Sequence, residues 1–182
     1  MEQVFITSDW HFCHDRDFIY KPRGFESTWE MTKEIINRHN ELVKPDDHVY
    51  VLGDLMLNNN DAGIHAIEQL NGQIHVIRGN HDTTARMDLY EKCPNIVEVC
   101  EGKYLKYEGQ TYFLSHYPCL TSNFDEDKPL KARVVNLCGH YHAEDPFIDW
   151  DKGLIFHAEV DGNDCYPWNI NDILTRVKEK IK

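Results

Sequence analysis

The stretch Ile74-His75-Val76-Ile77-Arg78-Gly79-Asn80-His81-Asp82 decides how the rest of this chain is interpreted. Its first half is an apolar run of strand length, and its second half is a polar turn that contains glycine. The four residues from Gly79 to Asp82 would occur in this order by chance in roughly one in a thousand chains of this length. Because amide, imidazole and carboxylate side chains all bind divalent metals, the stretch predicts a buried strand that ends in a metal-binding turn.

Four further apolar runs end in polar motifs of the same kind. Residues 4–6 precede Asp9-Trp10-His11, residues 49–52 precede Gly53-Asp54, residues 110–115 precede His116, and residues 134–138 precede Gly139-His140-Tyr141-His142. Each motif alone is weak evidence, since many strands end in a polar loop. Together they are specific, because motifs that follow strands in this way belong on one edge of the sheets, where their side chains can converge.

Helical patterns alternate with the first three apolar runs. Ser27-Thr28-Trp29-Glu30 matches a capping box that opens a helix ending before Pro45, and a second helix fits residues 61–70. This alternation predicts a parallel sheet with its functional loops at the carboxyl ends of the strands. The second half is mostly strands, at residues 96–99, 104–107, 110–115, 134–138 and 154–160, with a final helix over 171–180. We expect one α/β domain over residues 1–182.

Composition and charge exclude several classes of protein. Lys and Arg number 19 against 31 Asp and Glu, so the net charge is −12, which disfavours a nucleic-acid polymer as the partner. A hydrophobic content of 41% is that of a globular chain rather than a disordered one. Six cysteines form no CxxC pair, no apolar run reaches the length of a membrane helix, and no signal-like segment opens the sequence. We expect a cytoplasmic protein with no membrane partner, and the oligomeric state stays open.

In type, order and approximate spacing, the five motifs resemble the signature of the calcineurin-like metallophosphoesterase superfamily: D-x-H, G-D, G-N-H-[DE], H and G-H-x-H. The resemblance covers residues 4–160. The opening Ser-Asp-Trp-His-Phe-Cys-His, followed by Pro22-Arg23-Gly24-Phe25, is similar to the short single-domain bacterial and phage branch. The resemblance implies a four-layer αββα sandwich of two mixed β-sheets flanked by helices, and a dinuclear metal centre that hydrolyses phosphoesters.

The same resemblance implies the metal ligands. One divalent ion would be held by Asp9, His11, Asp54 and His142, and a second by Asp54, Asn80, His116 and His140. The shared Asp54 would bridge them, which suits two cations about 3.5 to 4 Å apart that clamp one phosphoryl group. The mixed nitrogen and oxygen donors suit Mn, Fe, Zn, Co or Ni better than Mg or Ca, and the sequence does not choose among them.

Four more residues are candidates for roles around the metals. We expect His81 to donate a proton to the leaving oxygen or to support it electrostatically, and Asp82 to orient either His81 or a neighbouring backbone turn. Between the first strand and the first helix, His14 and Arg23 are candidates to contact the phosphate of the substrate. For Arg23 the alternative is a solvated loop residue. His157, inside a predicted strand, is interpreted as structural, and the alternative is that the loop after Gly139-His140-Tyr141-His142 brings it near the site.

The expected function is metal-dependent hydrolysis of a phosphodiester, with a small nucleotide-like or cyclic-nucleotide substrate. A phosphomonoesterase, a non-catalytic binding module with this fold and a single-strand nuclease are the alternatives. Gly53-Asp54 is followed by Leu55-Met56-Leu57-Asn58, without the second aspartate and the arginine of the protein serine/threonine phosphatase branch, which disfavours that branch. The presence of all seven ligand positions and His81 disfavours a non-catalytic module, and the net charge disfavours a nuclease.

Overall fold

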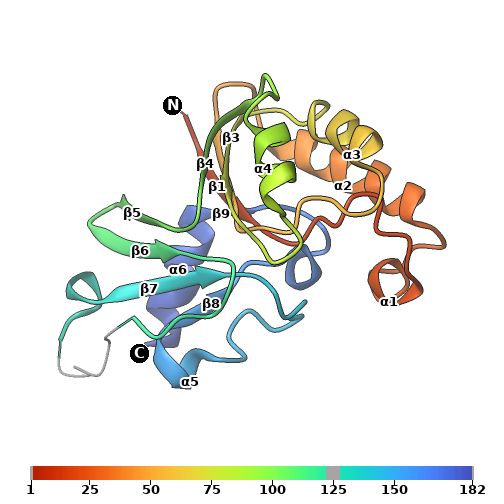
Figure 1. The fold of residues 1–182 in the computed structure, drawn as a ribbon. Coiled ribbons are helices and arrows are strands. Elements are labelled where there is room, and N and C mark those ends of the chain that lie inside the picture. Colours follow the sequence, from red (N-terminus) through yellow and green to blue (C-terminus); the bar gives the residue numbers. More distant parts are fainter. Residues whose placement is uncertain (1, 122–127, 182) are drawn as a thin grey trace.

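The computed structural model describes residues 2–121 and 128–181, and its strands form two sheets (Figure 1). In the first sheet the strand order is β4-β3-β2-β1-β9, and β1 to β4 run parallel while β9 is antiparallel to β1. The strands are β1 (Val4–Thr7), β2 (His48–Val51), β3 (Gln73–Ile77), β4 (Ile96–Cys100) and β9 (Trp168–Asn169). The apolar runs at residues 4–6, 49–52 and 74–77 therefore lie side by side, with their carboxyl ends at one edge.

The second sheet is smaller and also mixed. Its order is β5-β6-β7-β8, in which β5 (Lys103–Tyr107) and β6 (Gln110–Leu114) form a hairpin. The hairpin turns at Glu108 and Gly109, which both have positive φ. β6, β7 (Val134–Cys138) and β8 (Ile155–His157) are parallel, so the segments after β6 and β7 leave the sheet at the same end.

Helices cover the outer face of the first sheet. Met31 and Ile35 of α2, Ile67 of α3 and Tyr90 of α4 are buried in one core cluster with Val49 and other residues on that face of the sheet. Figure 1 shows these three helices together on one side of the first sheet. The helices are α1 (Asp17–Tyr20), α2 (Thr28–Leu42), α3 (Asn60–Ile67), α4 (Thr84–Tyr90), α5 (Trp150–Gly153) and α6 (Ile170–Lys180), with 3₁₀ turns η1 (Leu130–Ala132) and η2 (Val160–Asn163).

A second core cluster joins the two sheets. Because side chains alternate along a strand, Phe5 and Val49 face the helices while Ile6 and Tyr50 face the second sheet. There they meet buried residues of β6, β7 and β8 and the apolar side of α6, including Tyr112, Leu114, Leu137, Phe156, Ile173 and Val177. Burial on both faces explains why the central strands are continuously apolar.

The predicted arrangement of two mixed sheets flanked by helices is confirmed, and the differences lie in details. Ser27 caps α2 as expected, since its hydroxyl accepts a hydrogen bond from the Glu30 amide. The strand predicted over residues 154–160 is too long, because Leu154 has a left-handed φ of 54° and the chain enters η2 at Val160. The short β9 was not predicted. In the part of the chain that the structure describes, no helix is both long and apolar enough to cross a bilayer.

Candidate metal centre

The predicted ligands lie on turns that follow the carboxyl ends of β1, β2, β3, β6 and β7. Left-handed φ angles occur at Asp9 (59°), His11 (52°), Asp54 (56°), His140 (84°) and His142 (53°). Such angles are uncommon outside glycine and concentrate where function demands a particular backbone path. Adjacent turns are linked by backbone hydrogen bonds of 3.0 Å, from the Asp9 amide to the Gly53 carbonyl and from the His11 amide to the Asp54 carbonyl. The turns therefore position one another.

Glycine is required where two of these turns approach most closely. A Cβ atom at Gly79 would collide with the carboxylate of Asp54, and one at Gly139 would collide with Ser8 and the carboxylate of Asp9. Both collisions would displace a predicted ligand. The glycines of the Gly-Asn-His-Asp and Gly-His-Tyr-His motifs therefore permit the side chains beside them to converge.

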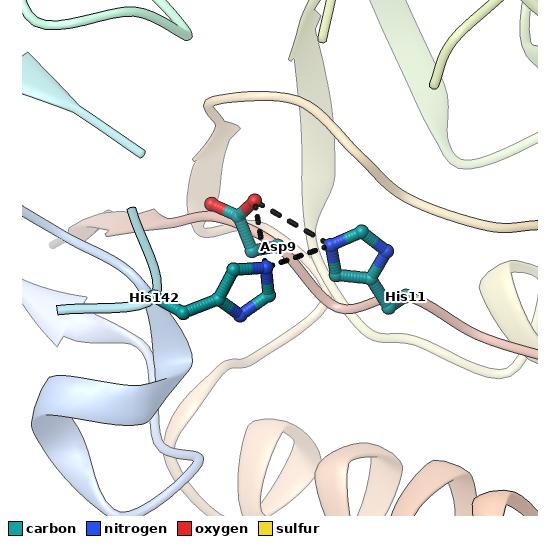
Figure 2. Close-up of side chains that lie close together, drawn as sticks. All are labelled: Asp9, His11 and His142. Atoms are coloured by element: carbon teal, nitrogen blue, oxygen red, sulfur yellow. Dashed lines mark hydrogen bonds and ion pairs between the residues drawn. The ribbon is translucent and has the colours of Figure 1, made fainter. Parts of the chain in front are cut away.

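Asp9, His11 and His142 form one group of converging side chains, the Asp9 group (Figure 2). His11 Nε2 lies 3.1 Å from His142 Nε2 and 3.6 Å from Asp9 Oδ1, and His142 Nε2 lies 3.9 Å from the same oxygen. Asp9 Oδ1 is buried without a hydrogen-bond partner among the described residues. A buried carboxylate oxygen without a partner, facing two imidazole nitrogens, fits a divalent cation at the centre of the group.

Asn80, His116 and His140 form a second group, the Asn80 group. Asn80 Oδ1 lies 2.8 Å from both His116 Nε2 and His140 Nδ1, and the two imidazole nitrogens are 3.2 Å apart. Asn80 is exposed, whereas His116 is buried. This is also a cluster of neutral nitrogen and oxygen donors with the chemistry of a metal site.

Asp54 lies between the two groups. Its Oδ2 is 3.8 Å from His11 Nε2 in the Asp9 group and 3.6 Å from His116 Nε2 in the Asn80 group. Asp9, Asp54 and His116 also converge closely enough to share an ion. The geometry thus brings all seven predicted ligands together, with Asp54 in the position of a bridge.

The electrostatics of the site favour a bound cation. Burial raises the pKa of Asp54 to about 6, and the nearby Asp9 carboxylate adds to this while His116 opposes it. Burial also favours the neutral form of Asp9, but the neighbouring imidazoles of His11 and His142 oppose this and hold the pKa of Asp9 below its usual value. Burial lowers the pKa of His11 to about 4, so this imidazole is neutral and able to donate a lone pair. Two crowded carboxylates beside the neutral imidazole of His11 are a donor set that a divalent ion would stabilise.

His81 lies on the open side of the site. Its side chain is 38% exposed, and Nε2 is 3.9 Å from Asp54 Oδ2. The backbone amide of His81 donates a 2.8 Å hydrogen bond to Asp54 Oδ1, so the same residue also orients the central carboxylate. An imidazole beside the clustered ligands and accessible to solvent can exchange a proton with a bound substrate.

Asp82 is buried beneath the site, and of the two roles considered for it the structure supports the orientation of a backbone turn. Its Oδ2 accepts hydrogen bonds from the amides of Asp54 (2.7 Å) and Gly79 (2.9 Å). Its Oδ1 accepts a 2.8 Å hydrogen bond from the Tyr90 hydroxyl, which burial keeps protonated by raising the pKa of Tyr90. Asp82 therefore ties the turn after β2 to the turn after β3, and it is a positioning residue rather than a group that meets substrate.

The structure corrects the expected role of Arg23. Its side chain is only 1% exposed and forms an ion pair with Asp161, so the guanidinium faces a buried carboxylate and is not available to a substrate phosphate. Arg23 was expected to contact phosphate because its buried partner, Asp161, is distant in sequence. The residues of the loop around Arg23 do not indicate this pairing.

His14 is also buried. Its Nδ1 is 3.2 Å from Nδ1 of His11, and burial lowers the pKa of His14 to about 4. His14 lies behind His11, where its neutral Nδ1 can accept a hydrogen bond from His11 Nδ1–H. This leaves His11 Nε2 free to bind metal.

Other residues around the centre were missed by the sequence analysis. Asp161 lies 3.2 Å from His142 Nδ1, and Glu159 accepts a 3.1 Å hydrogen bond from the Tyr141 amide between His140 and His142. A signal for Asp161 was present, because it follows the last predicted strand as the other motifs follow theirs. His157 is structural as interpreted: it is fully buried and bonded at 3.1 Å to both Asp149 and Glu159.

Two stacked mixed sheets, with aspartate, asparagine and histidine side chains clustered on the turns at their ends, define an α/β domain with a candidate metal centre. Comparison with known proteins places the chain within that class. Its residues 3–157 match the sequence profile of the calcineurin-like phosphoesterase superfamily domain. The chain belongs to this superfamily, and both the membership and the clustered ligands support hydrolysis of phosphoesters.

Three known proteins are similar to this chain in sequence or in fold. The uncharacterized protein MJ1445 of Methanocaldococcus jannaschii is 34% identical over 190 residues, which cover 100% of this chain and 94% of that protein. The gene 66 protein of mycobacterium phage L5 is 24% identical over 168 residues, or 81% of this chain and 80% of that protein. A crystal structure of the protein of unknown function AQ665 from Aquifex aeolicus shares the fold with a TM-score of 0.75 and 22% identity, covering 96% of this chain and 99% of that one.

Proposed function

We propose that this protein is a phosphodiesterase that uses two divalent metal ions to hydrolyse a small nucleotide-like or cyclic-nucleotide substrate. The observation that carries the proposal is the pair of ligand groups on either side of Asp54, whose Oδ2 lies within 3.8 Å of an imidazole nitrogen in each. Two sites that share a carboxylate suit the clamping of one phosphoryl group. Mn, Fe, Zn, Co and Ni fit the mixed nitrogen and oxygen donors.

In this mechanism each residue has a task set by its position. Bound divalent ions would polarise the phosphoryl group and lower the pKa of water. Asp9, His11 and His142 would hold one ion, Asn80, His116 and His140 would hold the other, and Asp54 would contact both. His81, on the open side, would donate a proton to the leaving oxygen as it departs. Asp82 would hold the turns that carry Asp54 and Asn80 in place.

Exposed aromatic side chains beside the site support a nucleotide-like substrate. The Tyr117 ring is 51% exposed and lies 4.7 Å from the ring of His140. Tyr141 is 56% exposed and lies 5.7 Å from the same imidazole. A phosphodiester held at the metals would bring its ester groups toward these rings, and an aromatic base or aryl group can stack on them.

Hydrolysis of bis-p-nitrophenyl phosphate and p-nitrophenyl phosphate by metal-stripped protein tests the proposal, with Mn, Ni, Co, Zn and Mg added back separately. We expect metal-dependent cleavage of the diester, followed by cleavage of cyclic or linear nucleotides in a wider screen. Cleavage of the monoester alone would make the protein a phosphomonoesterase. Tight binding of two ions without cleavage of any phosphoester would favour a non-catalytic binding module.

The role of the aromatic rim can be tested in the same assay. Tyr117→Leu keeps an apolar side chain but removes the ring, so we expect KM for an aryl or nucleotide diester to rise by roughly 5- to 10-fold, with kcat little changed. Tyr104→Leu is the matched control, because Tyr104 is 67% exposed on β5, outside the metal centre. Equal KM values for the two variants would remove Tyr117 from the substrate site.

We also place the protein in the cytoplasm. All six cysteines lie in the described residues as free thiols, and Cys93, Cys138 and Cys165 among them are buried. Free thiols are typical of a reducing compartment.

A further inference from the structure

We propose that Arg23 and Asp161 form a buried clamp that holds His142 in its Nδ1-protonated tautomer and thereby directs the Nε2 lone pair into the Asp9 group. This inference rests on the proposed metal site. It assigns positioning roles to Arg23, which the sequence analysis suggested for substrate binding, and to Asp161, which no motif identified. The Arg23 side chain is 1% exposed and that of Asp161 is 10% exposed, so the clamp is shielded from solvent and from substrate.

The N–H groups of the Arg23 guanidinium already donate hydrogen bonds to other groups of the protein. Nε donates to Asp161 Oδ1 at 2.9 Å, and Nη1 faces the Trp10 carbonyl at 3.3 Å and the Met31 sulfur at 3.4 Å. Nη2 donates to the Asp9 carbonyl at 2.8 Å and to Asp161 Oδ2 at 2.9 Å. Because Nη2 carries two hydrogens, these two oxygens account for both of them.

These hydrogen bonds determine which ring nitrogen of His142 carries the proton. Its Nδ1 lies 3.1 Å from Arg23 Nη2 and 3.2 Å from Asp161 Oδ2. Since Arg23 has no hydrogen left to donate there, Nδ1 carries its own hydrogen and donates it to the Asp161 carboxylate. When this ring is neutral, its lone pair is then on Nε2, which faces His11 Nε2 at 3.1 Å and Asp9 Oδ1 at 3.9 Å.

The clamp also connects two backbone segments beside the Asp9 group. Through Arg23 it binds the carbonyls of Asp9 and Trp10, which follow β1, and it joins them to Asp161 in η2. Asp9 has a left-handed φ of 59°, so an external hydrogen bond to its carbonyl helps to maintain an uncommon conformation. A carboxylate that orients a metal-binding imidazole typically contributes 10- to 100-fold to metal affinity.

Isothermal titration of metal-stripped protein with Mn²⁺ tests the clamp. For Asp161→Asn we expect one of two binding events to weaken by about 10- to 100-fold while the other is unchanged. Asp164→Asn is the matched control, because Asp164 lies in the same segment and pairs with Arg38 but is 83% exposed and away from the ligands. Equal affinities in Asp161→Asn and wild type would overturn the clamp. Failure of the wild-type protein to bind Mn²⁺ would instead overturn the proposed metal site.

Removing one partner of a buried ion pair can also unfold a protein, so a second measurement is needed. Long-range ¹H–¹⁵N spectra of the histidine rings at pH 8, in metal-stripped wild-type protein, report the tautomer of His142 directly. We expect Nδ1 to be protonated in wild type, and the double variant Arg23→Met/Asp161→Asn, which leaves no unpaired charge, to show a mixture of tautomers. Protonation of Nε2 in the wild-type protein would refute the clamp even if neither variant folds.

Discussion

The Asp9 group and the Asn80 group differ both in charge and in how their ligands are held. The Asp9 group has a carboxylate of its own, and its imidazoles are backed by side chains: His14 behind His11, and Asp161 behind His142. The Asn80 group has a neutral amide instead, and His116 is backed by the main chain, with Nδ1 donating to the Leu52 carbonyl at 2.8 Å.

This difference suggests that the two ions would not bind equally. An ion in the Asp9 group would meet two carboxylates, those of Asp9 and the shared Asp54, whereas an ion in the Asn80 group would meet only Asp54. The Asp9 carboxylate is also completely buried, so its attraction is less weakened by water. We therefore expect tight binding in the Asp9 group and weaker, more exchangeable binding in the Asn80 group.

The largest effect is expected at the residue common to both groups. Asp54→Asn removes the bridging charge, so both binding events should weaken and diester cleavage should fall by about 10³-fold or more, because several kcal/mol of stabilisation by the metals would be lost. Asp61→Asn, an exposed aspartate at the start of α3, is the control. Metal titration together with the diester assay measures both effects. Weakening of only one binding event would mean that Asp54 is not shared.

A smaller loss is expected at His81, which lies beside both groups without belonging to either. His81→Ala should reduce kcat by roughly 10²-fold or more, the usual scale for general acid catalysis, and should leave both metal affinities unchanged. The variant keeps the backbone amide that binds Asp54. His65→Ala on the exposed side of α3 controls for loss of an imidazole. Weaker metal binding in His81→Ala would show that the imidazole is itself a ligand.

The asymmetry between the groups can be tested by changing the oxygen ligand of each. Asp9→Asn should weaken the tighter binding event by at least about tenfold, because a buried charge is lost, whereas Asn80→Ala should weaken only the looser one. Calorimetric titration of the two variants with the same metal distinguishes these events. If both variants affect the same event, the division into two groups is wrong.

The sequence predicted the ligands better than it predicted the residues behind them. Asp9, Asp54 and Asn80 follow apolar strands, and parallel strands end at one edge, so local pattern and topology together bring these side chains to one place. Arg23 was misjudged because its burial depends on Asp161, which is 138 residues away. Pairing at such a distance is decided by packing, and no periodicity in a single sequence records it.

Short elements were missed for a related reason. β9 has only two residues, and its pairing of Trp168 with Ile6 gives too few positions to form an alternating pattern. It nevertheless sets the edge of the first sheet and the start of α6. Features stabilised mainly by tertiary contacts therefore require the structure.

The smallest effect on the site is expected from a substitution of His39. Such a variant tests whether burial also suppresses the protonation of a histidine that lies away from the metal centre. Burial lowers its pKa from 6.5 to about 4, although a 2.8 Å hydrogen bond from Nε2 to the Asn71 carbonyl opposes this, and its Nδ1 has no partner in the described structure. Between these pH values the unfolded chain binds a proton that the folded chain does not. Stability is therefore lost as pH falls from 6.5 toward 4.

His39→Gln should lose less stability than wild type as the pH falls, because glutamine does not titrate. It can still donate a hydrogen bond to the Asn71 carbonyl. A shift of one pKa unit corresponds to about 1.4 kcal/mol. The difference in the free energy of unfolding between the two proteins should therefore change by about 3 kcal/mol from pH 7 to pH 4. Urea unfolding of metal-stripped protein across this range measures it, and diester cleavage at pH 7 with metal restored should be the same in both. Parallel stability curves would show that His39 is protonated equally in the folded and unfolded chains, and suppression of histidine charge by burial would then be limited to the metal centre.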